Sequence, residues 1–138
     1  MKKYIKSIIT ILAVAVIGVI AVVGSRYEGA KGEKEVTYTS ITMDQAKEIF
    51  QTQGDYIILD VRRADEFAQG HIPGAINIAN EDIVSTEPKE LKDKDQTIYV
   101  YCRSGNRSKQ AATKLAAMGY TNIIEFGGII DWTGAVEK

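Results

Sequence analysis

The stretch that decides the fold is residues 97–107, which read TIYVYCRSGNR. Its first five residues are β-branched or aromatic and predict a strand. The strand delivers the chain directly to Cys102, and apolar residues at helical spacing predict a helix from Arg107 to Met118, which Gly119 is expected to end. Backbone amides converge at such a strand-to-helix junction, and the helix dipole favours negative charge there. The junction is therefore suited to hold an anion, and we expect it to favour the thiolate form of Cys102.

The loop residues strengthen this interpretation of Cys102. A lone cysteine is often a buried apolar residue, because free cysteine ranks among the most buried residue types. Here, however, Arg103 and Arg107 place positive charge beside the thiol, which favours a nucleophilic thiolate. Gly105 allows backbone conformations that turn amides toward the sulfur. We therefore predict a reactive thiol.

The segments around this stretch alternate between predicted strands and helices. Residues 56–61 form a continuous apolar run, which is typical of a strand buried on both faces, and Asp60 lies near its carboxyl end. Capping, periodicity and turn residues predict the other elements: a β-prone run at 36–39, helices at 42–50 and 64–69, a brief strand at 75–78, one or two helical turns within 81–91, a strand at 122–126 and a last helical turn holding Trp132. This alternation predicts an α/β fold with a central parallel sheet covered on both faces. Ligands bind such sheets beyond the carboxyl ends of the strands, where Cys102 and Asp60 both lie.

The composition excludes several functional classes. With 138 residues and 45% hydrophobic content, the chain has room for one domain and a short appendage. Lys and Arg number 17 against 18 Asp and Glu, so no basic face for nucleic acid is expected. One cysteine and one histidine exclude an intramolecular disulfide and are too few for a zinc or iron–sulfur site. We expect no metal and no organic cofactor, and a monomer.

The N-terminus differs from the rest of the chain. Residues 1–7 carry three lysines, and residues 8–24 are an apolar segment whose length lies between a signal-peptide core and a full membrane span. The segment is predicted to form an apolar helix that is either a cleaved signal peptide or a retained signal anchor. Lysines before it place residues 1–7 in the cytoplasm and the domain outside, by the positive-inside rule. Residues 25–35 are typical of a linker, and residues 36–138 form the predicted domain. We therefore expect an extracytoplasmic protein, membrane-anchored if the segment is uncleaved and secreted if it is cleaved.

Four motifs in order resemble the rhodanese family in its single-domain form. They are Asp60-Val61-Arg62, the run from Gly70 to Ala75, Cys102-Arg103-Ser104-Gly105-Asn106-Arg107-Ser108, and Gly127-Gly128 followed by Trp132. The resemblance spans about residues 39–132 and implies a rhodanese-like three-layer domain. It also implies that Cys102 takes sulfane sulfur from thiosulfate or another small anionic donor, holds it as a persulfide and passes it to a thiol or cyanide.

The resemblance also assigns roles to the residues around Cys102. The backbone amides of Arg103, Ser104, Gly105, Asn106 and Arg107 would hold the persulfide anion, and the Arg103 and Arg107 side chains would attract anionic donors.

The residues leave two other functions open. The first is a cysteine-dependent phosphatase or arsenate reductase, although phosphatases of related fold have five residues between cysteine and arginine, whereas four separate Cys102 from Arg107. The second is a non-catalytic module that uses the loop to bind an anion or a partner. Retention of the cysteine argues against the second function without excluding it.

Four residues outside the loop have both structural and functional interpretations. Asp60 could orient a loop arginine, but capping a helix or satisfying turn amides is the simpler role. Arg62 could bind a donor or pair with Asp65 or Glu66. His71 lies in the turn that ends at Pro73-Gly74 and is expected to fix that turn rather than act as a base. Arg63 replaces the acidic residue that relatives usually have, and it adds positive charge near the expected site.

Overall fold

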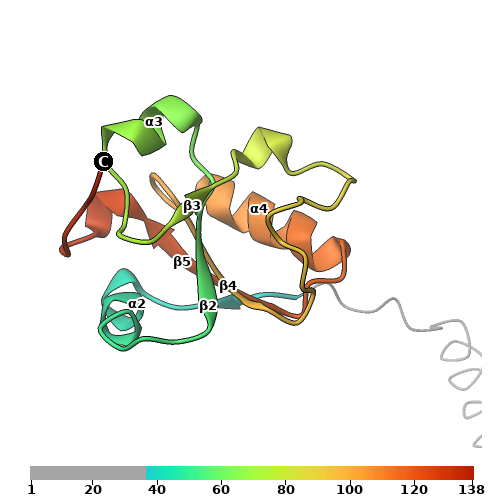
Figure 1. Ribbon diagram of the computed structural model, residues 1–138, viewed down its shortest axis with the longest axis horizontal. Helices are drawn as coiled ribbons and strands as arrows, with labels where there is room; N and C mark the ends of the chain where they lie inside the picture. Colours follow the sequence, from blue (N-terminus) through green and yellow to red (C-terminus); the bar gives the residue numbers. More distant parts are fainter. Residues whose placement is uncertain (1–36) are drawn as a thin grey trace, which may run out of the picture. The chain divides into compact units, whose positions relative to one another are not determined.

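The computed structural model describes residues 37–138. Within these residues the chain forms five strands, three α-helices and two short 3-10 helices, coloured along the sequence in Figure 1. The strands are β1 (Thr39–Ser40), β2 (Tyr56–Asp60), β3 (Ile76–Asn77), β4 (Thr97–Cys102) and β5 (Asn122–Gly128); the helices are α2 (Met43–Ile49), α3 (Ala64–Gln69), η1 (Asn80–Asp82), α4 (Asn106–Ala117) and η2 (Ile129–Asp131). All strand pairs are parallel, in the order β1-β5-β4-β2-β3. This confirms the predicted α/β fold with a central parallel sheet.

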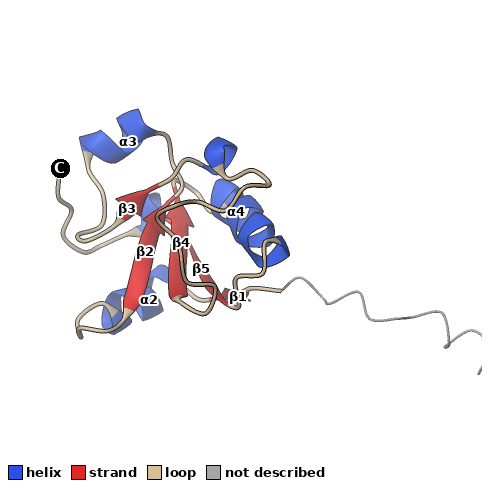
Figure 2. Ribbon diagram, turned by 45° about the vertical axis from the view of Figure 1, so that its right-hand side comes forward, coloured by secondary structure: helices blue, strands red, loops and turns tan. Residues whose placement is uncertain are grey.

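Side-chain alternation along the strands divides the core into two layers. In β4, Ile98, Val100 and Cys102 face α4, whereas Tyr99 and Tyr101 face α2. Figure 2 shows the strands running between these two helices. Because β4 is the middle strand and is buried on both faces, the residue at its end lies deep in the domain.

Local signals explain where the two covering helices begin and end. The Thr42 side chain accepts the Gln45 backbone N–H, and the Gln45 side chain accepts the Thr42 backbone N–H, so a capping box begins α2 where capping residues predicted a helix. Gly105 precedes α4 with φ +101°, a left-handed conformation that favours glycine. Gly119 follows α4 with φ +94° and ends it as expected.

Two predicted elements differ in the structure. Residues 81–91 were expected to hold one or two helical turns, but only the 3-10 turn η1 forms, and the chain then continues to Leu91 as turns and loop. Buried Ile83 and Leu91 fix this segment on the α4 side of the core without a regular helix. The β-prone run at 36–39 pairs later than predicted, at Thr39–Ser40, because β1 follows the register of β5.

The predicted apolar segment at 8–24 lies outside the described residues. Within residues 37–138, no helix has the length and hydropathy needed to cross a membrane.

Candidate active site

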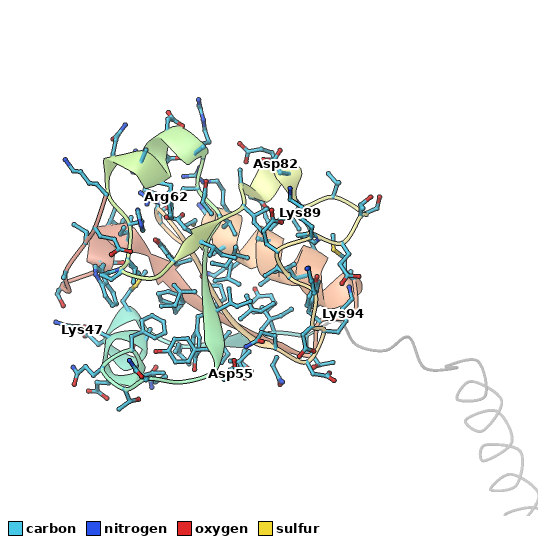
Figure 3. The ribbon with its side chains drawn as sticks, viewed as in Figure 1. Lys47, Asp55, Arg62, Asp82, Lys89 and Lys94 are labelled. Carbon is cyan, nitrogen blue, oxygen red and sulfur yellow. The ribbon has the colours of Figure 1, made fainter. Side chains whose placement is uncertain are left out.

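Cys102 is the last residue of β4 and lies at the carboxyl edge of the sheet. Its strand partner is Gly128 of β5, across an irregularity in the register between Val100 and Cys102. On the other side of β4, Asp60 ends β2 opposite Tyr101. The two predicted site residues therefore lie at the ends of adjacent strands. Figure 3 shows which edge this is, because Asp55 before β2 and Arg62 after it lie at opposite ends of the sheet.

The Cys102 sulfur is buried and is held by the loop that follows it. The residue is 1% exposed, and the Gly105 backbone N–H donates to Sγ over 3.0 Å. Burial and reactivity were alternatives in the sequence, but the structure combines burial with an amide directed at the sulfur. Of the five amides expected to surround the sulfur, this one contacts the thiol. The first-turn amides of Asn106 and Arg107 have no acceptor within α4, as at any helix N-terminus.

The end of β5 holds this loop in place. A Cβ on Gly128 would overlap the carbonyl group of Arg103 and the Cα of Ser104, so only glycine fits this contact. Two residues later, the Ile130 N–H donates to the Arg103 carbonyl over 3.2 Å. Gly127-Gly128 therefore packs directly against the cysteine loop.

Two polar residues to which the sequence patterns assigned no role connect to the sulfur, Ser108 directly and Glu125 through Ser108. Ser108 Oγ is 3.6 Å from Cys102 Sγ, and it is 2.6 Å from Oε1 of Glu125. Glu125 is 3% exposed and Ser108 is fully buried. The alternation of β5 could have indicated Glu125, because Ile123 and Glu125 share the face that packs on α4.

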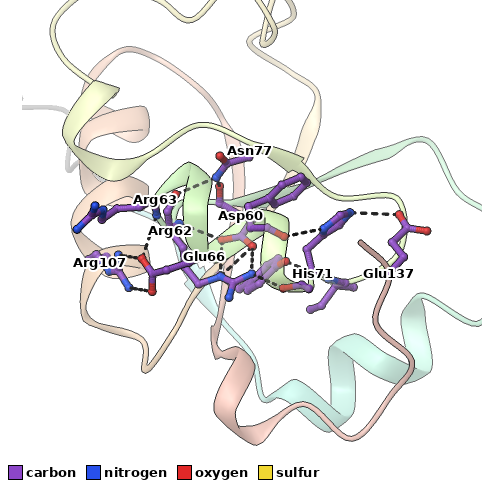
Figure 4. Close-up of polar contacts among 12 residues, drawn as sticks. Asp60, Arg62, Arg63, Glu66, His71, Asn77, Arg107 and Glu137 are labelled. Carbon is purple, nitrogen blue, oxygen red and sulfur yellow. Dashed lines mark hydrogen bonds and ion pairs between the residues drawn. The ribbon is translucent and has the colours of Figure 1, made fainter.

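Asp60 and Arg62 form a buried ion pair, shown in Figure 4. Arg62 donates from Nη2 to Asp60 Oδ2 over 2.6 Å and from Nε to both carboxylate oxygens over 3.0 Å. A further Nη2 bond reaches the Gly70 carbonyl over 2.8 Å. Burial opposes the charge of Arg62, but the Asp60 hydrogen bonds and charge raise its pKa above the ordinary value. The pair also affects Tyr101, whose pKa is raised by burial and then by the Asp60 charge.

The predicted partners of Arg62 were therefore wrong. Glu66 instead binds Arg107 of α4 with two hydrogen bonds of 2.7 and 2.9 Å, and Asp65 lies 3.2 Å from Arg63. The backbone N–H and the guanidinium of Arg62 both donate to the Asp60 carboxylate, so the Arg62 side chain is held at the end of β2 and not at the first turn of α3. Asp60 likewise orients Arg62 and not an arginine of the cysteine loop. The Nε and Nη2 groups of Arg62 are engaged by Asp60 and Gly70, and the role of Arg62 in binding a donor stays a prediction.

The two loop arginines differ in their contacts. Arg107 is partly buried, and its hydrogen bonds with Glu66 raise its own pKa and lower the pKa of Glu66 to about 2. The negative charge that Cys102 carries as a thiolate also contributes to raising the pKa of Arg107. Arg103 is exposed, as are Ser104 and Asn106. The loop thus presents one tethered cation beside the sulfur and one on the surface.

Comparison with known proteins agrees with this geometry. The model of the rhodanese-like domain family matches residues 42–135. The chain belongs to the rhodanese-like domain family. It is 37% identical over 101 residues to the thiosulfate sulfurtransferase GlpE of Haemophilus influenzae, covering 72% of this chain and 92% of that protein. It is 38% identical over 73 residues to the thiosulfate sulfurtransferase PspE of Escherichia coli, covering 53% of this chain and 70% of PspE.

A solved structure and larger relatives share the same domain. A rhodanese-like domain protein from Staphylococcus aureus has a TM-score of 0.62 at 31% identity, covering 72% of this chain and 96% of that one. The chain spans 22% of the adenylyltransferase and sulfurtransferase UBA4 of Candida albicans and 56% of the putative sulfur carrier protein YrkF of Bacillus subtilis.

His71 connects the turn of this rhodanese-like domain to its C-terminus. Its ring Nδ1 is 3.0 Å from the Phe67 carbonyl, and its backbone exchanges two hydrogen bonds of 2.9 Å with Glu137. The ring also stacks on Phe67 with centroids 3.7 Å apart. These contacts agree with the expectation that His71 fixes the turn. Trp132 donates its ring N–H to the Ala135 carbonyl and packs near Phe50, on the α2 side of the sheet.

Proposed function

We propose that this protein is a sulfurtransferase that moves sulfane sulfur through a persulfide on Cys102. The observation that carries the proposal is the Gly105 N–H directed at Sγ over 3.0 Å, at the end of the central strand and before the first turn of α4. A donor directed at sulfur from a helix N-terminus favours an anionic sulfur. The names of GlpE and PspE, both thiosulfate sulfurtransferases, support thiosulfate as a donor to test first.

The proposed cycle has two balanced steps. The Cys102 thiolate attacks the outer sulfur of thiosulfate, the new S–S bond forms, and sulfite leaves with the electron pair of the broken bond. The persulfide anion on Cys102 then gives its outer sulfur to cyanide or to a thiol, and Cys102 is regenerated. Amides of the first turn of α4, which lack acceptors within the helix, are placed to stabilise the outer sulfur.

Positive charge at the loop suits an anionic donor. Arg103 is exposed and available to a donor, whereas Arg107 is anchored by Glu66 and acts from a fixed position. Because Cys102 is 1% exposed, we expect the donor to displace the loop side chains when it reaches Sγ.

The test is mass spectrometry of the protein after incubation with thiosulfate. The expected product is a gain of one sulfur atom on Cys102, removed by cyanide with formation of thiocyanate. Cys102→Ala should show neither reaction, and Ser85→Ala, at an exposed position, should behave as wild type. Unmodified wild-type protein after a panel of sulfane donors would overturn the proposal.

The same preparation distinguishes the other functions. Cys102-dependent turnover of a phosphate ester or of arsenate, without a sulfur adduct, would indicate a phosphatase or arsenate reductase. Binding of anions without turnover of any of them would indicate a non-catalytic module.

We also propose that residues 8–24 direct the domain across or into a membrane, with residues 1–7 in the cytoplasm. The support is the uncharged run from Ile8 to Val23 after three lysines. N-terminal sequencing of the mature protein distinguishes cleavage from anchoring. A protein recovered with Met1 intact and without membrane association would contradict both the cleaved signal peptide and the retained anchor.

A further inference from the structure

Glu125 is a buried carboxyl group one hydroxyl away from the Cys102 sulfur. Its Oε1 is 2.6 Å from Ser108 Oγ and accepts the Gly127 backbone N–H over 2.9 Å. Its Oε2 accepts Ser40 Oγ–H over 3.3 Å. With 3% of the residue exposed, these contacts replace water at the carboxyl group. The sulfur, the hydroxyl and the carboxyl group thus form a continuous chain of hydrogen bonds from β4 through α4 to β5.

The proton of Ser108 cannot satisfy all of its neighbours at once. Ser108 Oγ lies 2.8 Å from the Gly105 carbonyl and 2.6 Å from Glu125 Oε1, and both are acceptors when Glu125 is ionised. A hydroxyl has one proton to donate. A proton on Glu125 resolves the conflict, because Glu125 then donates to Ser108 and Ser108 donates onward to Gly105 or to the sulfur. The geometry thus fits a carboxyl group that takes up a proton.

No cation balances Glu125 in the part of the chain that the structure describes. None of the ion pairs between residues 37 and 138 includes it. A thiolate and a carboxylate joined by one hydroxyl, both buried, would repel each other. Charged and titratable groups on the surrounding elements include Arg103 of the loop, Arg107 of α4 with Glu66 of α3, Asp60 at the end of β2 with Arg62, Asp131 of η2 and Tyr38 before β1. The other cations of α4 are Lys109, which is exposed, and Lys114, which binds the Asn80 carbonyl. Arg62 and Arg107 already bind carboxylates, and Arg103 is exposed.

We propose that Ser108 and Glu125 form an internal proton relay that accepts the Cys102 thiol proton and returns it. The S–H proton moves to Ser108 Oγ as the Ser108 proton moves to Glu125 Oε1, so the thiolate forms while Glu125 becomes neutral. The buried cluster keeps one negative charge throughout, and no oxidant or reductant is needed. Ser108 and Glu125 act through the sulfur and are positioning residues, not groups that touch the donor.

The relay deepens the proposed function and rests on it for its biological use. When a thiol accepts the outer sulfur, its proton enters the site: the thiol and the Cys102 persulfide anion give a new persulfide anion and the Cys102 thiol. The next cycle requires the thiolate. Transfer of that proton to Glu125 through Ser108 would restore the thiolate, and the one proton brought in per turnover would then leave Glu125 for solvent beside exposed Ser40, which binds Oε2.

The relay predicts an unusual pH dependence of thiolate formation. The measurement is the ultraviolet absorbance of the thiolate in the full chain, with Cys102→Ala as the background for tyrosine. In wild type, the thiolate fraction should change less than about twofold per pH unit over the range in which the cluster holds one proton, since the proton only moves within it. In Glu125→Gln, which cannot take up a proton, the fraction should fall about tenfold per pH unit below its midpoint.

Two further measurements keep the proposal testable if Glu125→Gln does not fold. Ser108→Ala removes the bridge and should also give the steep profile. In wild type, the infrared difference spectrum between thiol and thiolate forms should show the carbonyl band of a protonated carboxyl group appearing with the thiolate. Glu90→Gln, an exposed acid-to-amide change, is the matched control and should keep the flat profile.

Persulfide mass spectrometry on the same samples distinguishes the two proposals. A steep wild-type profile, equal to that of Glu125→Gln, would overturn the relay even if the persulfide forms. A flat wild-type profile without any persulfide would leave the relay standing and remove the proposed function.

Discussion

Two buried acids lie on β2 and β5, the strands on either side of β4, and their surroundings differ. Asp60, the last residue of β2, has the Arg62 guanidinium against both of its carboxylate oxygens, and Asn77 donates to the backbone carbonyls of Asp60 and Arg62. Glu125, in β5, has two hydroxyls and one amide but no cation among the described residues. A buried pair that satisfies its own charge favours a fixed structure. A buried acid that is hydrogen-bonded only to hydroxyl groups and an amide, with no cation, is instead suited to take up and release a proton.

The largest expected effect comes from making the same acid-to-amide change at both sites. Asp60→Asn leaves the Arg62 charge buried beside a neutral group, and it should lower the free energy of unfolding by about 3–5 kcal/mol. Glu125→Gln keeps an acceptor for Gly127 and a donor for Ser108, and it should cost less than about 1 kcal/mol. Urea unfolding of both variants at neutral pH measures the difference.

A double variant separates charge from packing at the Asp60 site. Replacing the pair by apolar residues, Asp60→Leu with Arg62→Met, should recover much of the lost stability, because no charge is then left unpaired. Equal losses of unfolding free energy in Asp60→Asn and Glu125→Gln would show that the fold depends on the charge of Glu125 as much as on that of Asp60.

A smaller effect is expected from Gly128→Ala, which affects the cysteine loop and not the Asp60 pair. The new methyl group meets the backbone of Arg103 and Ser104, so the loop must move, at a cost of about 1–3 kcal/mol in unfolding free energy. Persulfide formation from thiosulfate, followed by mass spectrometry, should slow at least about tenfold because the Gly105 amide is displaced from the sulfur.

Gly74→Ala provides the matched control for this substitution. Gly74 has φ +79° and open space around its Cβ position, so alanine adds backbone strain of about 1–2 kcal/mol without a clash. Persulfide formation should keep the wild-type rate. A loss of rate in Gly74→Ala equal to that in Gly128→Ala would mean that general destabilisation explains both.

The smallest effect concerns the partly exposed pair between Glu66 and Arg107. Arg107 lowers the pKa of Glu66 from 4.5 to about 2, so the fold favours the ionised carboxylate. The stabilisation is fully present above pH 4.5 and is lost as the pH falls toward 2. Glu66→Gln should therefore cost about 1 kcal/mol at neutral pH.

The decisive observation is how the difference in unfolding free energy between wild type and Glu66→Gln depends on pH. In urea unfolding, wild type and Glu66→Gln should converge as the pH falls through the window from 4.5 to about 2. Asp65→Asn removes an exposed pair with Arg63 and should change stability by less than about 0.5 kcal/mol at any of these pH values. A constant difference between wild type and Glu66→Gln would show that the ion pair is not its cause.

Residues with strong local patterns allowed most of the fold to be predicted. The β-branched and aromatic run became β4, Thr42 capped α2, and Gly119 ended α4. Each of these signals acts within a few residues, so no knowledge of the tertiary structure was needed. The segment after Asp82 was not predictable in the same way, because buried Ile83 and Leu91 determine its path by packing across the core.

The partners of the site residues were much less predictable. Cys102 and its loop were recognisable because the strand, the glycine and the helix are contiguous. Glu125 lies 17 residues from Ser108 and meets it only because β5 pairs beside β4. Arg62 has three carboxylates within four residues along the chain: Asp60, Asp65 and Glu66. Which of them it binds depends on the direction of its side chain at the end of β2, and a sequence pattern does not specify that direction.

The pairing of β1 with β5 has a consequence for how the domain is made. Thr39 pairs with Ile124, so β1 cannot join the sheet until β5 has formed. Contacts between segments so far apart in the sequence slow folding. During synthesis, the ribosome must release β5 before the sheet can close. Glu125 is in that final strand, and Cys102 therefore remains without its carboxyl neighbour until translation of the domain is nearly finished.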